Sequence, residues 1–143
     1  MSELKPQSYD NHKMFVPLYH FVLAPILIVI FIASIIYLFK EQFSYSSLLI
    51  FGLSLCMAIL FVLIRQFATK LQDRSIVQEE KFRHFQLTGK PLDTRLSLQQ
   101  IIALRFAGDE SFPALCMKAA ETSMTPDKIK QSIKHWRADH FRV

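Results

Sequence analysis

Two pairs of adjacent carboxylates are the residues best suited by type to acid–base chemistry, Glu79 with Glu80 and Asp109 with Glu110. Sequence neighbours point to different sides of a helix, so neither pair is placed to share one substrate. A basic residue stands close to each pair, Arg83 and Arg105 respectively, which favours ordinary ion pairs. We therefore expect a protein that is not an enzyme.

The sequence predicts neither a metal site nor a cofactor site. His135 and His140 are five positions apart, and not at the spacing of four that places two metal ligands on one helix face. The 3 glycines are isolated, so no glycine-rich loop is present to bind phosphate. Cys56 and Cys116 have apolar neighbours and no CxxC spacing, which predicts buried thiols. We expect no cofactor and no metal.

Two uncharged apolar segments, residues 18–39 and 47–64, precede most of these polar residues. At a rise of about 1.5 Å per residue the first covers a hydrocarbon core of about 30 Å, and the second is close to the minimum length. Only residues 40–46 connect them, so we predict a tight antiparallel transmembrane hairpin. Gly52 and Cys56 form a small-xxx-small pattern that would let a neighbouring helix approach closely.

Lysine and arginine are distributed unevenly around the two predicted spans. Residues 1–17 carry two, the connecting loop carries Lys40 alone, and five follow the second span within residues 65–83. Positively charged flanks remain on the cytoplasmic side of a membrane. Both termini are therefore predicted to be cytoplasmic.

Residues 65–88 contain no glycine or proline, which predicts that the second span continues into a cytoplasmic stem helix. A narrow apolar stripe at spacings of three and four runs among the many charges of this helix: Phe67, Leu71, Val77 or Gln78, Phe82 and Phe85. Charged residues are expected to pair along the helix: Lys70 with Asp73, Glu79 with Arg83, and Glu80 with His84. Gly89 and Pro91 are expected to end it.

Three short helices are predicted within the cytoplasmic tail, residues 89–143. They start at a Ser97 capping box, at Asp109 or Ser111, and at Thr125 before a proline. The first is expected to run to Ala107, and the last to carry Ile129, Ile133 and Trp136 on one face. The fold class is thus an all-α membrane protein. So small a tail has little core of its own, so it should pack against the stem, a second copy or another protein.

Several strings beyond the second span, in this order and spacing, resemble an uncharacterised family of small bacterial two-span inner-membrane proteins. They are Gln72-Asp73-Arg74, Glu79-Glu80, Leu104-Arg105-Phe106-Ala107, Asp109-Glu110, and a closing set of Ile129-Lys130, Ile133-Lys134, Trp136, Asp139 and Arg142-Val143. The resemblance covers most of the chain from Gln7 onward. It implies a hairpin in the cytoplasmic membrane of a bacterium with a helical cytosolic tail, and no established reaction.

These observations favour a non-catalytic accessory or scaffold subunit of an inner-membrane complex, or a homo-oligomer, in contact with membrane lipid. The residues predicted to dock on a partner are Arg74, Glu79, Glu80, Arg105, Asp109, Glu110 and Trp136, with Gly52 and Cys56 for helix packing. An alternative is a membrane tether for RNA or the ribosome, because the chain after Ile64 carries 14 lysines and arginines against 9 acids. The same charge is also explained without RNA, because a basic region is expected beside any cytoplasmic membrane face.

Overall fold

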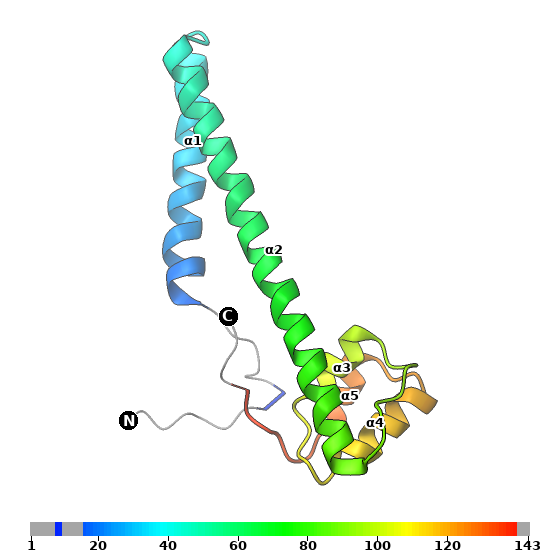
Figure 1. Ribbon diagram of the computed structural model, residues 1–143. Helices are drawn as coiled ribbons and strands as arrows, with labels where there is room; N and C mark the ends of the chain where they lie inside the picture. The colour runs from blue at the N-terminus through cyan, green and yellow to red at the C-terminus, as the bar shows by residue number, and fades with distance from the viewer. Residues whose placement is uncertain (1–7, 10–15, 140–143) are drawn as a thin grey trace. The chain divides into compact units, whose positions relative to one another are not determined.

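The computed structural model describes residues 8–9 and 16–139 of the chain (Figure 1). Within this part the secondary structure is helical apart from one isolated antiparallel bridge, between Ala107 and Trp136. The chain divides into a hairpin unit, Phe15–Thr69, and a stem–tail unit that comprises chiefly Lys70–Arg142. The predicted all-α class is confirmed for the described residues.

The hairpin unit contains a π-helical segment, η1 (Leu18–Leu23), then α1 (Ala24–Lys40) and the first part of α2 (Tyr45–Thr88). The backbone widens just before Pro25, which has no N–H to donate. The N–H of Ala24 donates to the carbonyl of Tyr19, five residues back, as in a π-helix. The proline thus changes the helix type at the start of α1.

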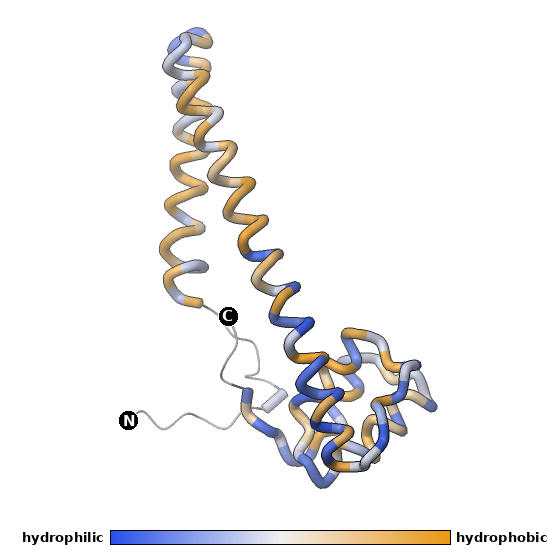
Figure 2. Tube along the Cα trace, in the orientation of Figure 1, coloured by the Kyte–Doolittle hydropathy of each residue, from blue (hydrophilic) through white to orange (hydrophobic). Residues whose placement is uncertain are grey.

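Two helices of the chain are long and apolar enough to cross a membrane, judged by length and composition (Figure 2). They are Leu18–Lys40, of 23 residues, and Tyr45–Thr88, of 44 residues. Residues 41–44 connect the two helices, fewer than the predicted residues 40–46. The hydroxyl of Ser44 accepts a hydrogen bond from the N–H of Ser47 at 3.3 Å, so α2 already begins at Tyr45. These features are compatible with a membrane protein.

Side-chain hydrogen bonds link the helices of the hairpin: one between a pair of buried serines, and one from Tyr19, whose hydroxyl donates to the carbonyl of Phe61 at 3.1 Å. The hydroxyls of Ser34 and Ser54 lie 2.7 Å apart and are buried. The contact does not involve the predicted small-residue pair, since a Cβ on Gly52 would meet nothing within 4 Å and Cys56 is exposed. The expectation of a buried thiol is therefore wrong for Cys56, and close approach of another helix at Gly52 stays a prediction.

The second apolar segment continues without interruption through α2 to Thr88, which confirms the predicted long helix. Gly89 follows with a φ of +69°, in the left-handed region that favours glycine. Its N–H donates to the carbonyl of Phe85 at 2.8 Å, which satisfies one of the last carbonyls of the helix. The predicted end at Gly89 is confirmed.

The stem, the part of α2 from Lys70 onward, faces the tail with a polar side. Ile76, Glu80 and Arg83 are buried, whereas Phe82 is 63 % exposed and Phe85 is 55 % exposed. Leu71 and Phe67 are exposed as well. The predicted apolar stripe therefore lies mostly on the outside of the unit: the charged side chains of Glu80 and Arg83 point inward, and Phe82 and Phe85 point outward.

The tail contains α3 (Leu98–Leu104), α4 (Phe112–Glu121) and α5 (Pro126–Ser132). The Ser97 capping box and the Thr125 cap are both present as predicted. Helix α3 ends three residues before the expected Ala107, and α5 ends before Ile133, whose backbone is extended. Trp136 therefore does not continue the last helix, which corrects that prediction.

The tail builds its core mostly from its own apolar side chains. The buried members include Leu104, Phe106, Phe112, Cys116 and Ile129, and Val77 of the stem packs against them. The sequence left open whether the tail packs against the stem, a second copy or another protein; the structure shows it packed against the stem of its own chain.

We predict that Gly89→Ala destabilises the stem–tail unit by about 1–2 kcal/mol, the cost of a left-handed conformation for a residue with a Cβ. An added Cβ would meet nothing within 4 Å, so the loss reflects the backbone alone. Gly89→Asn is the control, because asparagine tolerates this region better. Thermal unfolding followed by the fluorescence of Trp136, the only tryptophan, measures both variants. Equal stability of all three proteins would contradict this explanation of the helix end.

Candidate functional site

Arg83 of α2 is the centre of a buried ion-pair cluster that joins the stem to the tail. Its side chain donates to Glu80 at 2.9 Å through Nη1, to Asp109 at 2.7 Å through Nε, and to the carbonyl of Ala107 at 2.6 Å through Nη2. The guanidinium lies over the ring of Phe112, with Cζ 4.2 Å from the ring centroid. One arginine of the stem thus binds the turn between α3 and α4 and the first residue of α4.

Local sequence explains how this cluster is positioned. Glu80 and Arg83 are three residues apart on one face of α2, where side chains are helical neighbours. Phe112 begins α4 and is fully buried, so its ring supplies a flat surface for the guanidinium. Burial raises the pKa of Glu80, and this effect outweighs the opposing hydrogen bond and charge of Arg83.

A second arginine, at the C-terminal end of α3, pairs with a carboxylate from the segment after α5. The Nε of buried Arg105 lies 3.0 Å from Oδ2 of Asp139. Its guanidinium stacks over Phe106, at 4.3 Å from the ring centroid, and Trp136 contacts the same ring at a centroid distance of 4.9 Å. The N–H of Arg137 donates to the carbonyl of Phe106 at 2.8 Å, which holds this extended segment against the end of α3.

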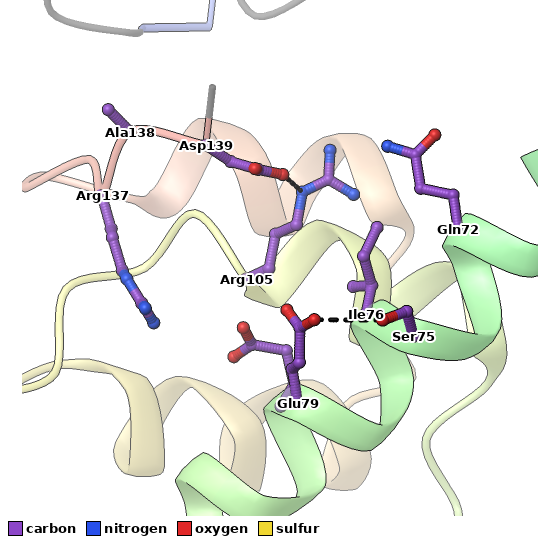
Figure 3. Close-up of a pocket in the computed structure, with 9 residues that line it drawn as sticks. Gln72, Ser75, Ile76, Glu79, Arg105, Arg137, Ala138 and Asp139 are labelled. Carbon is purple, nitrogen blue, oxygen red and sulfur yellow. Dashed lines mark hydrogen bonds and ion pairs between the residues drawn. The ribbon is translucent and has the colours of Figure 1, made fainter. Parts of the chain in front are cut away.

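A pocket of about 330 Å³ lies between the stem and the segment after α5 (Figure 3). Its polar lining combines carboxylates, guanidiniums, an amide and a hydroxyl, contributed by Gln72, Ser75, Glu79, Glu80, Arg105, Arg137 and Asp139. The hydroxyl of Ser75 donates to Glu79 at 3.1 Å. Both polar atoms of the Gln72 amide are buried and have no hydrogen-bond partner among the described residues.

The ion pairs of this site join segments of the stem–tail unit to one another. Three carboxylates, those of Glu80, Asp109 and Asp139, each pair with an arginine. Within residues 8–9 and 16–139, no three metal-ligating side chains come together. Burial raises the pKa of Cys116 to about 12, so this residue is a neutral thiol near pH 7 and matches the predicted buried cysteine.

The structure divides the residues predicted to dock on a partner into two groups. Glu80, Arg105 and Trp136 are turned inward, and Asp109 bonds Arg83 while most of its side chain stays exposed. Arg74, Glu79 and Glu110 are exposed. Glu80 and Asp109 therefore help to hold the tail on the stem through Arg83, whereas Arg105 and Trp136 make contacts within the tail. A docking role stays a prediction chiefly for the second group.

Sequence reasoning missed the central residue of the cluster. It paired Arg83 with Glu79 and Glu80 with His84, whereas the structure pairs Arg83 with Glu80 and joins Glu79 to Ser75. The spacing of three between Glu80 and Arg83 was a usable signal. The bond from Arg83 to Asp109 crosses 26 positions, and no local pattern indicates it.

A family model matches residues 1–143, the whole chain, and its description is "Family of unknown function (DUF6526)". The chain belongs to this family. The expected membership of an uncharacterised family is thus confirmed for this DUF6526 protein. Neither the curated proteins nor the solved structures gave a match to the chain.

We predict that Arg83→Met destabilises the stem–tail unit of this DUF6526 protein by about 3–5 kcal/mol, because removing one partner leaves a carboxylate buried without its counter-charge. Urea unfolding followed by Trp136 fluorescence gives the free energy. Arg95→Met is the control, since Arg95 pairs with Asp93 on the exposed surface and should matter little. A similar, small loss in both variants would show that the cluster does not hold the tail.

The raised pKa of Glu80 predicts how stability depends on pH. The folded state binds the proton of Glu80 more tightly than the unfolded state does. Protonated Glu80 therefore contributes its full stabilisation below the ordinary pKa of 4.5, and this stabilisation is lost as pH rises through the pKa of Glu80 in the folded state. We expect the wild type to lose stability from about pH 5 upward relative to Glu80→Gln, whose amide does not titrate. Parallel pH curves for the two proteins would contradict the assigned cause.

Proposed function

We propose that this DUF6526 protein is a non-catalytic accessory or scaffold subunit of a bacterial inner-membrane complex. The two apolar helices support anchoring in the membrane. The excess of lysine and arginine at residues 1–17 and after Ile64, against Lys40 alone between the helices, supports two cytoplasmic termini. In this proposal the stem–tail unit is the part that meets a partner in the cytoplasm.

The observation that carries the proposal is the exposed side of the stem. We name Leu71, Gln78, Phe82 and Phe85 the outer stripe; its three apolar members are each more than half exposed. The stem residue that packs against the core is Val77, and the buried stem residues Ile76 and Arg83 lie away from the outer stripe. A row of large apolar side chains that the unit's own fold does not use is typical of an interaction surface.

Charged residues beside the outer stripe support the same role. Arg74 and Glu79 are exposed on the stem, and both were predicted from the sequence to dock on a partner. Among the described residues, neither forms an ion pair within the chain. Polar residues around an apolar centre are the usual composition of a protein interface.

Binding of RNA or the ribosome is the alternative. Lys128, Lys134 and Arg137 are exposed and suit phosphate contacts. Trp136, the aromatic residue that would stack on bases, instead lies against Phe106. RNA binding would weaken steeply with salt, whereas a packed protein interface would persist, so a salt titration separates the two.

We predict that replacing both Phe82 and Phe85 with serine removes companions from the protein purified from native membranes in mild detergent. The wild type should co-purify with at least one other membrane protein, and the double variant should have lost it. Met117→Ser is the matched control, because Met117 is equally exposed, at 61 %, but lies on α4. A wild type that purifies without any other protein contradicts the proposed function.

A further inference from the structure

We infer that the outer stripe is the contact between two copies of this chain, whose stems form a parallel two-stranded coiled coil. The inference rests on the proposed function and names one occupant of the surface described there. The observations that support it are the spacing, the exposure and the charges of residues within the stem–tail unit.

The spacing of the exposed residues fits a heptad repeat. Leu71, Gln78 and Phe85 are seven residues apart and take the d positions, while Ser75 and Phe82 are seven apart and take the a positions. All five are exposed. The buried residues Ile76 and Arg83 take b positions, and Glu80 takes an f position. Positions b and f face away from the partner helix of a coiled coil, so the tail and a second stem can contact different sides of the same helix.

The charges beside this repeat are complementary between two copies. In the same register Arg74 takes a g position, and Glu79 takes the e position of the next heptad, five residues later. Residues at g and the following e′ face one another across a parallel dimer. Arg74 of one copy therefore lies opposite Glu79 of the second copy, and the two-fold axis makes this ion pair twice.

A second copy fits this surface better than an unrelated helix. Two copies inserted in the same orientation present their stems in parallel, which is the arrangement that the g–e′ pairing requires. Gln78 and Ser75 are polar residues at the seam, so they weaken the coiled coil relative to an all-apolar one, and each would face its own counterpart across the two-fold axis. The same sequence thus supplies both sides of the contact.

Site-specific cross-linking of the full-length protein in bacterial membranes tests this arrangement. In a Cys56→Ser background, which removes the exposed native thiol, Gln78→Cys places a thiol at the seam and Leu87→Cys places one at an outer f position of the same helix. Leu87 is itself exposed, at 43 %, so accessibility is matched. With a short bis-maleimide, we expect at least tenfold more cross-linked dimer from Gln78→Cys than from Leu87→Cys.

Charge exchange then identifies the facing residues. Arg74→Glu and Glu79→Arg should each lower the Gln78→Cys dimer yield several-fold through like-charge repulsion, and the double variant should restore it. Restoration also shows that the variants still fold. Equal cross-linking at Gln78 and Leu87, or a double variant no better than either single one, overturns the inference.

These outcomes are separable from those of the proposed function. A purified complex that contains other proteins but shows no dimer at Gln78→Cys contradicts the second copy and leaves the accessory role standing. A cross-linked dimer with no further companion supports the second copy and contradicts the accessory role.

Discussion

The guanidinium of Arg83 lies inside the stem–tail unit, and a charge removed from water is stable there only if neighbouring groups replace the lost hydration. The stem itself supplies Glu80, one turn away. The tail must supply the rest, and it does so with Asp109 and the carbonyl of Ala107, at the turn between α3 and α4. A buried ion pair contributes less net stability than its contacts suggest, but a partner left alone is costly, so the cluster selects one way for the tail to lie on α2.

This constraint explains why the stem has Phe82 and Phe85 on the outside. Since α3, α4 and α5 bury Leu104, Phe112 and Ile129 among themselves, they need little apolar surface from the stem. The inner face carries the polar cluster instead. Phe82 and Phe85 are left exposed, and they connect the fold of this unit to the function we propose for it.

Local patterns predicted the elements whose causes are local. The left-handed glycine at the end of α2, the Ser97 capping box and the Thr125 cap each depend on a few adjacent residues, and all three are present. The side of the stem that faces the core could not be predicted, because apolar periodicity shows that a face exists but not which partner covers it. Trp136 was placed on a helix because the sequence does not show its bridge to Ala107, a contact between distant positions.

Hydrogen exchange of the full-length protein in lipid nanodiscs tests most directly whether the chain's own stem, and no companion, holds the tail. The amides of α3 and α4 should be strongly protected in the wild type and equally protected when Phe82 and Phe85 are both serine, because the core and the Arg83 cluster do not include the outer stripe. Loss of protection throughout α3 and α4 in the serine variant would contradict the account, since it would show that the tail folds only when something covers the outside of the stem.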